Sequence, residues 1–423
     1  MLLQMTVFLA VAASLVGPAK AAGASPLVSD AALQQAGFIK FWEARLPLAA
    51  NDAVRDAYLL DEALYVVTKG GSVFSLKADV GLLRWGVKLT EADYRIYPPA
   101  HLREGNGAGP VVIPTTTAVF IYDRFGGELK QRFTPEFPLG SAAVGFDNKL
   151  FMGGADGRFY SLSVDPRFPN RPIKRWEVRA GGPVTATPIL YDRDTLLFAS
   201  QGGSVFSCLA DDKTLRWSFR SEGAINGDPA VDDSGVYVAS ADRSLYKLNR
   251  GIGTVLWRAR FPRPLTEGPT AVAQTVYQYC PDQGLTALDA MTGQEKWRIE
   301  DGRSLAAHGT NGDVVFTTGN LLQVVHHENG EVLATVEAPL VLKAVSNTQD
   351  GSMYLLGRDG RVLCIRLDDV PYLRRQQVMA AREQLNQPPT EESKSPERLP
   401  QPFVPQPDPT DNDPLRSKKD SKP

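Results

Sequence analysis

A recurring motif with a period of about 40 residues constrains the fold of this sequence more than any other feature. In its clearest copy, residues 287–297 (ALDAMTGQEKW), a short alternating segment leads into a turn at Thr292 and Gly293 and then to Trp297. Glycine tolerates the positive φ of a tight hairpin, and the carboxylate of Asp289 can accept hydrogen bonds from backbone N–H groups of the turn. A tryptophan at a fixed distance from each turn is expected to bury its ring against a neighbouring copy.

Copies of this motif run along most of the chain. Weaker versions read GGSVFSLKADVGLLRW, GGSVFSCLADDKTLRW and RSLYKLNRGIGTVLW. The residue that follows each turn defines a series of anchor positions, spaced 37 to 48 residues apart: Trp42, Trp85, Phe133, Trp176, Trp217, Trp257, Trp297 and Ala334. Each full interval holds four short runs with period-two apolar alternation, which indicates strands and not the helices of a solenoid. The pattern predicts an all-β fold, an eight-bladed β-propeller of four-stranded antiparallel blades over residues 38–369.

The two ends of the repeat region complement each other. Residues 38–48, which contain Trp42, form a strand without a hairpin partner before it, whereas the last unit, from Met353, lacks its outer strand. We expect the N-terminal strand to pair with that last unit and close the ring, because this pairing satisfies two exposed strand edges. Eight blades require that the diverged second unit, around Phe133, is also a blade; a seven-bladed ring is the alternative.

The sequence outside the repeats predicts export and a disordered tail. Residues 1–24 read as a signal peptide with an apolar core and small residues at its end, although an uncleaved anchor is the alternative because no Lys or Arg precedes that core. Pro18 stands where a lipoprotein would need cysteine, so lipid anchoring is not expected. Residues 371–386 read as a short helical segment and residues 387–423 as a proline-rich disordered tail. The predicted location is the periplasm or cell envelope.

Charge and cysteine usage argue against two classes of function. The formal net charge of −2 gives no basic surface for nucleic acid. Cys208, Cys280 and Cys364 lie far apart, without a CxxC pair, in apolar strand patterns. We expect each to be a small buried residue, with a reactive thiol as the alternative.

Signatures of catalysis and metal binding are also missing. No HExxH, GxSxG or GxxxxGK[ST] pattern occurs. The adjacent His326 and His327 would point to opposite faces of a strand, which argues against one shared metal. Carboxylates near the turns, such as Asp289, read as solvated or bonded to the backbone. We therefore expect no catalytic, cofactor-binding or metal-binding residues.

The pattern A-x-D-x-x-T-G-x-x-x-W of residues 287–297 resembles the repeat of the PQQ-repeat, or quinoprotein dehydrogenase-like, propellers. One class in this family comprises dehydrogenases that bind PQQ and calcium above the central channel. This chain lacks the adjacent cysteine pair of the methanol dehydrogenase type, and its candidate calcium ligands Asp228, Asp232 and Asp282 are scattered. A second class comprises binding platforms such as the propeller lipoprotein subunit of the outer-membrane β-barrel assembly machinery.

The resemblance and the missing chemistry together imply a non-catalytic scaffold for protein–protein interaction in the bacterial cell envelope. We expect no cofactor, a monomeric propeller, an envelope protein of unknown identity as partner, and membrane contact that is indirect or through an uncleaved signal. Two alternatives stay open: a PQQ-dependent dehydrogenase with calcium, and a propeller that binds a carbohydrate or another small ligand in its central funnel.

The candidate contact surfaces are two segments that depart from the repeat. Residues 89–109 form the largest insertion, and residues 165–172 replace a short turn. The first segment contains tyrosine and arginine, and the second contains arginine and phenylalanine. Tyrosine and arginine are common in interface hot spots. The alternative for the first segment is that its aromatic residues cover the end of a neighbouring blade. The candidate partner-binding residues are Tyr94, Arg95, Tyr97, His101, Arg103, Arg167, Phe168 and Arg171.

The closure of the ring is testable by truncation. Deleting the residues from the predicted end of the signal peptide through Leu48 should lower the urea midpoint of unfolding of the whole protein, because the last blade would lose its outer strand. An unchanged midpoint would contradict the closure.

Overall fold

The computed structural model describes residues 25–92, 94–104, 107–165, 167–168, 170–192, 194–310, 312–347 and 351–368. The expected signal peptide, helical segment and proline-rich tail (residues 1–24, 371–386 and 387–423) lie outside the described residues and stay predictions. The chain divides into residues 1–371 and 372–423, and every described residue belongs to the first unit. No helix in the described part is long and apolar enough to cross a membrane.

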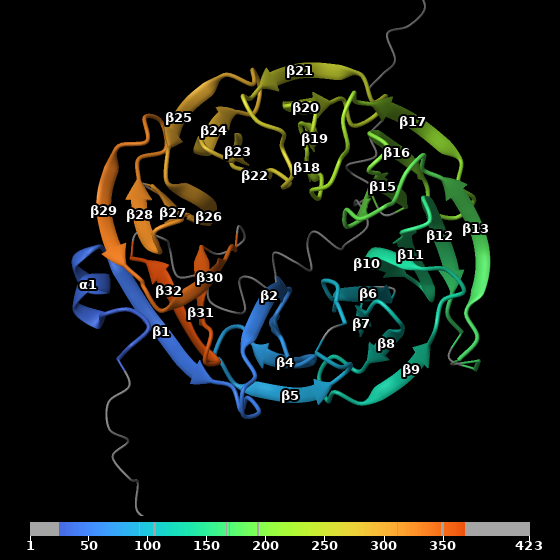
Figure 1. Cartoon of the computed structure of the whole chain (residues 1–423), viewed down its shortest axis with the longest axis horizontal. Coiled ribbons are helices and arrows are strands. Elements are labelled where there is room, and N and C mark those ends of the chain that lie inside the picture. Colours follow the sequence, from blue (N-terminus) through green and yellow to red (C-terminus); the bar gives the residue numbers. More distant parts are fainter. Residues whose placement is uncertain are drawn as a thin grey trace, which may run out of the picture. The chain divides into compact units, whose positions relative to one another are not determined.

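The described strands form eight four-stranded antiparallel blades arranged in a ring (Figure 1). In each of the first seven blades the chain runs outward as a meander, so that the first strand lies nearest the centre and the fourth at the rim (Figure 1). The diverged second unit is a blade like the others. The prediction of an all-β, eight-bladed propeller is confirmed.

The first four blades follow one another along the chain. The first consists of β2 (Val54–Leu60), β3 (Ala63–Thr68), β4 (Ser72–Lys77) and β5 (Leu83–Lys88). The second consists of β6 (Ala100–Glu104), β7 (Gly107–Pro114), β8 (Val119–Tyr122) and β9 (Leu129–Phe133). The third consists of β10 (Leu139–Phe146), β11 (Lys149–Gly154), β12 (Arg158–Ser163) and β13 (Ile173–Arg179). The fourth consists of β14 (Ile189–Tyr191), β15 (Thr195–Ala199), β16 (Ser204–Leu209) and β17 (Leu215–Arg220). A parallel bridge from β10 to β6 joins the second and third blades into one eight-stranded sheet.

The remaining blades complete the ring. The fifth consists of β18 (Ala230–Asp232), β19 (Gly235–Ser240), β20 (Ser244–Leu248) and β21 (Val255–Arg260). The sixth consists of β22 (Thr270–Val272), β23 (Thr275–Cys280), β24 (Gly284–Asp289) and β25 (Glu295–Ile299). The seventh consists of β26 (Gly302–His308), β27 (Asp313–Thr317), β28 (Leu321–Val325) and β29 (Val332–Glu337). The eighth consists of β30 (Val341–Val345), β31 (Ser352–Gly357), β32 (Arg361–Leu367) and β1 (Phe38–Arg45).

The N-terminal strand β1 is the outer strand of the eighth blade. It pairs antiparallel with β32, from Phe38 opposite Leu367 to Arg45 opposite Arg361. The last blade therefore takes three strands from the end of the repeat region and one from its beginning, as the unmatched strand had predicted. This pairing closes the ring with backbone hydrogen bonds and leaves neither strand as a free edge.

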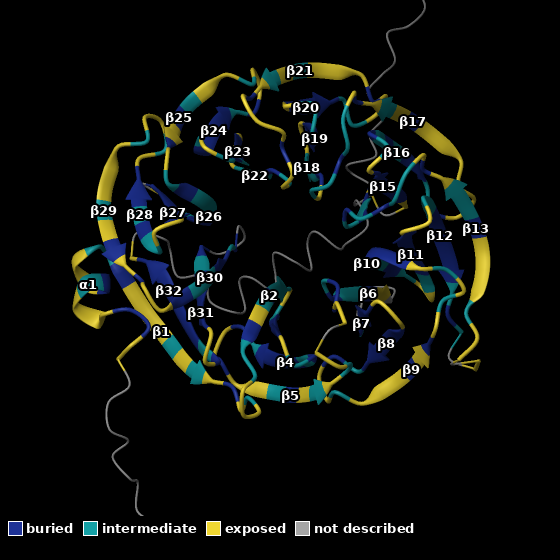
Figure 2. Cartoon of the chain, in the orientation of Figure 1, coloured by how far each residue is buried: buried dark blue, intermediate teal, exposed yellow. Residues whose placement is uncertain are grey.

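The hydrophobic core lies between the blades. The second strands β3 and β19 are buried along their whole length, because each face of a blade is covered by a neighbouring blade. Outer strands such as β17 and β21 alternate between exposed positions and partly or fully buried ones. Figure 2 shows the result, a ring of buried strands with an exposed rim.

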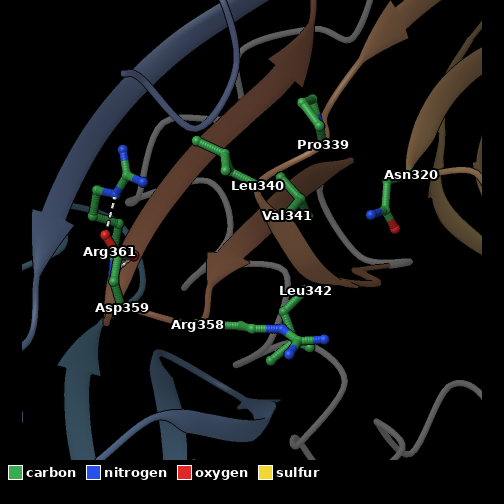
Figure 3. Close-up of a pocket in the computed structure, with 8 residues that line it drawn as sticks. All are labelled: Asn320, Pro339, Leu340, Val341, Leu342, Arg358, Asp359 and Arg361. Carbon is green, nitrogen blue, oxygen red and sulfur yellow. Dashed lines mark hydrogen bonds and ion pairs between the residues drawn. The ribbon is translucent and has the colours of Figure 1, made fainter. Parts of the chain in front are cut away.

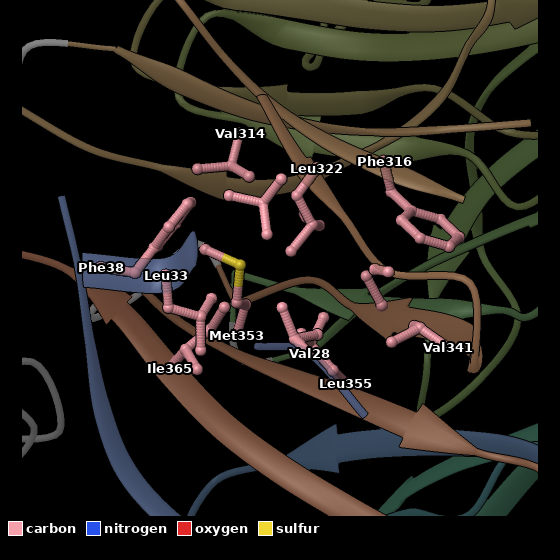
Figure 4. Close-up of a cluster of buried hydrophobic side chains, with 14 of the residues drawn as sticks. Val28, Leu33, Phe38, Val314, Phe316, Leu322, Val341, Met353, Leu355 and Ile365 are labelled. Carbon is pink, nitrogen blue, oxygen red and sulfur yellow. The ribbon is translucent and has the colours of Figure 1, made fainter. Parts of the chain in front are cut away.

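A short helix, α1 (Asp30–Gln35), covers the junction of the seventh and eighth blades. Leu33 from this helix and Val28 before it pack against Val314 of β27 and Met353 of β31 in one cluster (Figure 4). The sequence did not predict this helix, because six residues are too few to show a helical period.

The anchor tryptophans join each blade to the next. The indole Nε1 of Trp297 donates to the backbone oxygen of His327 over 2.7 Å, and that of Trp257 to Ala290 over 3.0 Å. Each acceptor lies in the turn between the third and fourth strands of the following blade. The same bond runs from Trp42 to Ala78, from Trp85 to Arg124, from Trp176 to Ala210 and from Trp217 to Arg250.

The turn glycine is required by both backbone conformation and space. Gly293 has φ +73°, and a Cβ on it would lie 2.6 Å from the ring of Trp257. Asp289 completes the turn, because its Oδ1 accepts from the backbone N–H groups of Met291 and Thr292. Each recurring feature of the motif is thus used in hairpin geometry or blade packing, as expected. The fourth blade has Lys213 at the glycine position with φ 59°, a conformation that costs about 1–2 kcal/mol for a residue with a Cβ.

Two anchor positions depart from tryptophan for different reasons. Phe133 is buried, but its ring has no N–H to donate, and the turn of the following blade is the longer segment 165–172. Ala334 has no such turn to contact, because the outer strand of the eighth blade comes from the N-terminus. Ala334 packs instead against the cluster that contains Leu33 of α1.

The contact of a turn with an indole can be tested at Gly293. Gly293→Ala should lower the free energy of unfolding by about 2–4 kcal/mol, because the new Cβ strains the backbone and displaces Trp257. Gly251→Ala is the matched control, since its Cβ would meet only Asn249 Oδ1 at 3.5 Å. Urea unfolding measures both, and equal losses would contradict the role of the indole contact.

Candidate functional site

The segment 89–109 is only partly an exposed loop. It contributes β6 and the start of β7 to the second blade. Tyr97 is buried, and its hydroxyl donates to the backbone oxygen of Leu139 in the third blade over 2.9 Å. Tyr94, Arg95 and Arg103 remain exposed. A partner could therefore reach these three side chains, whereas Tyr97 fastens the segment to the ring.

His101 belongs to a polar cluster between the first and second blades. Its side chain is 8% exposed, its Nδ1 lies 2.7 Å from Asp61 Oδ2, and its Nε2 lies 2.8 Å from the hydroxyl of Tyr65. The guanidinium of Arg124 lies 3.3 Å from Glu62 and 3.5 Å from Asp61. These bonds tie the outer turn of one blade to the first turn of the preceding blade, so His101 is a junction residue.

The segment 165–172 contains one arginine that is already paired. Arg167 donates through Nε and Nη2 to Asp165, at 3.0 Å to Oδ1 and 2.6 Å to Oδ2. Phe168 is 57% exposed. Arg171 is also exposed, and no ion pair joins it to another described residue. Phe168 and Arg171 are thus the members of this segment that are available to a partner.

A groove of about 590 Å³ lies beside this segment, at the outer edge of the second and third blades. Phe137 and Tyr160 stack in it with ring centroids 3.6 Å apart and an interplanar angle of 12°. Burial, followed by the hydrogen bond to Asp156, raises the pKa of Tyr160 to about 12, so the phenol stays neutral at physiological pH. Six charged side chains of mixed sign also line the groove: Glu136, Asp156, Arg158, Arg171, Lys174 and Glu177.

A second hollow of about 450 Å³ lies between the seventh and eighth blades (Figure 3). Leu340 comes from the connection into β30, Leu342 lies in β30, and Arg361 begins β32 (Figure 3). The Nε of Arg361 donates to Asp359 Oδ2 over 2.7 Å. This hollow belongs to the closure of the ring, because β32 is the strand that pairs with β1.

A third feature brings together two histidines and an aspartate of the seventh blade. His308 ends β26, Asp313 begins β27 and His327 follows β28. Nδ1 of His308 lies 2.7 Å and Nδ1 of His327 lies 3.1 Å from the same Oδ1 of Asp313, which is fully buried. Sequence reasoning considered His326 with His327 and missed this group, because its members are brought together only by the pairing of three strands. His326 lies apart, and its Nδ1 accepts from the backbone N–H of Glu328.

Electrostatics keep Asp313 ionised. Burial alone would raise the pKa of its carboxyl, but the hydrogen bonds from His308 and Tyr277, with the charge of His327, outweigh burial and lower the pKa. The hydroxyl of Tyr277 in the sixth blade donates to Asp313 Oδ2 over 2.6 Å.

The scattered aspartates do not converge. Asp228 accepts from the backbone N–H of Thr187, and Asp282 pairs with Arg263. Asp232 is bonded within its own hairpin, to the hydroxyl of Tyr237. Within the described residues, the group with metal-ligand spacing is the histidine–aspartate group of the seventh blade.

The three cysteines are buried in separate strands, as expected. Burial raises the pKa of Cys208 to about 12, so this thiol does not ionise at physiological pH. Burial also raises the pKa of Cys280. A reactive thiolate is therefore not favoured at either position.

Comparisons with known proteins agree with this architecture. Residues 173–369 match the family model described as outer membrane protein assembly factor BamB. The crystal structure of BamB from Moraxella catarrhalis is similar with a TM-score of 0.62 and 16% identity, covering 79% of this chain and 99% of that one. The chain is thus a β-propeller that resembles BamB and the PQQ-repeat propellers.

Two further structures share the propeller fold. The computationally designed Ika8 protein has a TM-score of 0.59 and 15% identity, with 76% of this chain and 98% of that chain covered. The C-terminal WD40 domain of Sif2 has a TM-score of 0.58 and 10% identity, with 79% and 99% covered. No curated protein matches this chain by sequence.

The junction role of the His101 cluster can be tested at Arg124. Arg124→Leu should lower the free energy of unfolding by about 2 kcal/mol, since its guanidinium no longer bridges Asp61 and Glu62 and Glu62 keeps only its ion pair with Arg84. Arg103→Leu, at an exposed position of the same blade, should change it by less than about 0.5 kcal/mol. Urea unfolding compares the two variants, and equal effects would contradict a junction role.

Proposed function

We propose that this PQQ-repeat propeller is an exported, non-catalytic scaffold that mediates protein–protein interaction in the bacterial cell envelope. The likeness to BamB supports an envelope location and an interaction role, since that protein is named an outer membrane protein assembly factor. The likeness extends over 99% of the BamB chain, so it concerns a whole propeller and not a part of one. Export itself rests on the apolar N-terminus of the sequence.

One observation carries the proposal: the groove of about 590 Å³ lies where the repeat breaks. A regular turn in this place would contact the anchor of the previous blade, but here the anchor is Phe133 and the turn is the longer segment 165–172. Arg171 lines the groove and forms no ion pair with another described residue, and Phe168 is exposed on the segment beside it. They offer a charged and an apolar anchor of the types that dominate interface energies. The stacked rings of Phe137 and Tyr160 give the groove a rigid aromatic wall.

The groove fits an extended protein segment better than a small cofactor. Its lining is polar and carries charges of both signs. The acidic residues are Glu136, Asp156 and Glu177, and the basic residues are Arg158, Arg171 and Lys174. A dehydrogenase would need calcium ligands that converge, and the aspartates suggested for this role each bond to a different partner: Asp228 to Thr187, Asp232 to Tyr237 and Asp282 to Arg263. We propose that the protein acts without PQQ.

The proposal is tested by quantitative capture of envelope proteins after cross-linking in the native envelope. Phe168→Ala and Arg171→Ala should each reduce recovery of the specific partner at least about tenfold, as expected for hot-spot side chains worth about 2 kcal/mol. Met291→Ala is the matched control, because Met291 is 68% exposed on the regular turn of the sixth blade.

Two results would contradict the proposal. Recovery that Met291→Ala reduces as strongly as Phe168→Ala would show that the groove is not the contact. A bound-quinone spectrum with dye-linked oxidation of an alcohol or sugar, after addition of PQQ and calcium, would establish the dehydrogenase alternative. Saturable binding of a carbohydrate without any protein partner would establish the ligand-binding alternative.

A further inference from the structure

The group of His308, Asp313 and His327 has the properties of a metal site. One ligand atom from each of the three residues can be chosen so that all lie within 4.8 Å of one another. The two histidine side chains are 24% and 22% exposed, whereas the carboxylate is fully buried. An ion could therefore enter from solvent and meet an anion that is already in place.

The hydrogen bonds around His327 leave one ring nitrogen unsatisfied. Its Nε2 lies 3.2 Å from the backbone oxygen of Thr310, which can only accept, so Nε2 carries the proton. In the neutral ring, Nδ1 then presents a lone pair. This Nδ1 is buried, lies 3.1 Å from Asp313 Oδ1 and makes no hydrogen bond with any described residue. Two lone-pair atoms at this separation repel each other unless a proton or a metal ion lies between them.

The surroundings orient the group in the way that outer partners orient metal ligands. The hydroxyl of Tyr277 donates to Asp313 Oδ2, which leaves Oδ1 facing both histidines. Thr310 fixes the tautomer of His327, and the indole of Trp297 fixes the backbone of His327 through its carbonyl oxygen. Tyr277 and Trp297 belong to the sixth blade, so the ligands are positioned by two blades.

The negative charge of Asp313 also favours a bound cation. Asp313 is a fully buried carboxylate, and within the described residues no lysine or arginine forms an ion pair with it. A buried carboxylate is stabilised when it is paired or when it binds a metal. The imidazole nitrogens of His308 and His327 are good ligands for a metal ion that would supply this charge.

We propose that His308, Asp313 and His327 bind one divalent transition-metal ion of the Zn²⁺ class. Tetrahedral zinc holds nitrogen and oxygen ligands at about 2.0–2.2 Å, which places neighbouring ligand atoms about 3.3 Å apart. The two nitrogens lie 2.7 and 3.1 Å from the carboxylate oxygen, so small side-chain rotations are sufficient. Two histidines and one carboxylate leave a fourth position open to water or to a ligand from a partner.

Zinc binding to the tag-free, chelator-treated protein tests the proposal, measured by titration calorimetry in competition with a chromogenic chelator. The wild type should bind one Zn²⁺ per chain, and Co²⁺ in its place should show the visible bands of tetrahedral coordination. His308→Ala and His327→Ala should each weaken binding at least about tenfold. Tyr277→Phe should weaken it about tenfold as well, because Tyr277 is a positioning residue for Asp313.

His326→Ala is the matched control, since His326 is adjacent in sequence and lies outside the group. It should keep the wild-type affinity. Circular dichroism and the urea midpoint establish that each variant is folded before its binding is compared. Absence of stoichiometric Zn²⁺ binding in the folded wild type would overturn the proposal, as would an equal loss in His326→Ala and His327→Ala. Neither result bears on the proposed partner-binding groove, because the groove lies at the second and third blades and the proposed metal site lies in the seventh blade.

Discussion

The bond from an indole to the next turn is the interaction on which the rest of the ring depends. It is a short-range contact between consecutive blades, yet repetition around a closed ring makes every blade depend on its neighbours. The indole Nε1 needs a backbone oxygen within reach, and the turn needs a left-handed residue that is glycine in most copies and Lys213 in the turn that meets Trp176. Trp257 and Gly293 meet both conditions. Trp42 makes the same bond from the N-terminal strand to Ala78 of the first blade. Closure thus uses the same chemistry as the interior of the array.

The places where this contact is missing are the places where the molecule differs from a plain array. Phe133 faces a long segment in place of a tight turn, and the groove lies there. Ala334 faces no turn at all, because β1 reaches the eighth blade from the other end of the chain. The helix α1 packs at that junction, with Leu33 fully buried. A repeat protein can vary at such positions because the remaining blade contacts hold the ring.

Tyrosines at equivalent positions in two blades have different hydrogen-bond partners. Tyr65 and Tyr277 occupy the same place in their blades, each near an anchor tryptophan, with ring centroids 5.9 and 5.8 Å from Trp85 and Trp297. Each hydroxyl reaches the following blade. Tyr65 meets His101 in a junction with charged neighbours, whereas Tyr277 meets Asp313 in the group proposed to bind metal. The scaffold therefore supplies a fixed orienting hydroxyl, and the neighbouring residues decide its use.

The sequence by itself determined the architecture, because period, turn chemistry and anchor are local properties that recur in each copy. Residues 287–297 contain the aspartate, the glycine and the tryptophan that form the hairpin turn and its contact with the next blade. The unmatched strand at Trp42 was enough to predict the closure of the ring. Tertiary structure alone decided which polar residues meet. It buried Tyr97 in a segment that looked like a loop, and it placed His327 beside His308 and away from adjacent His326. Separation along the sequence does not predict such side-chain contacts, because strand pairing brings together residues that no local pattern connects.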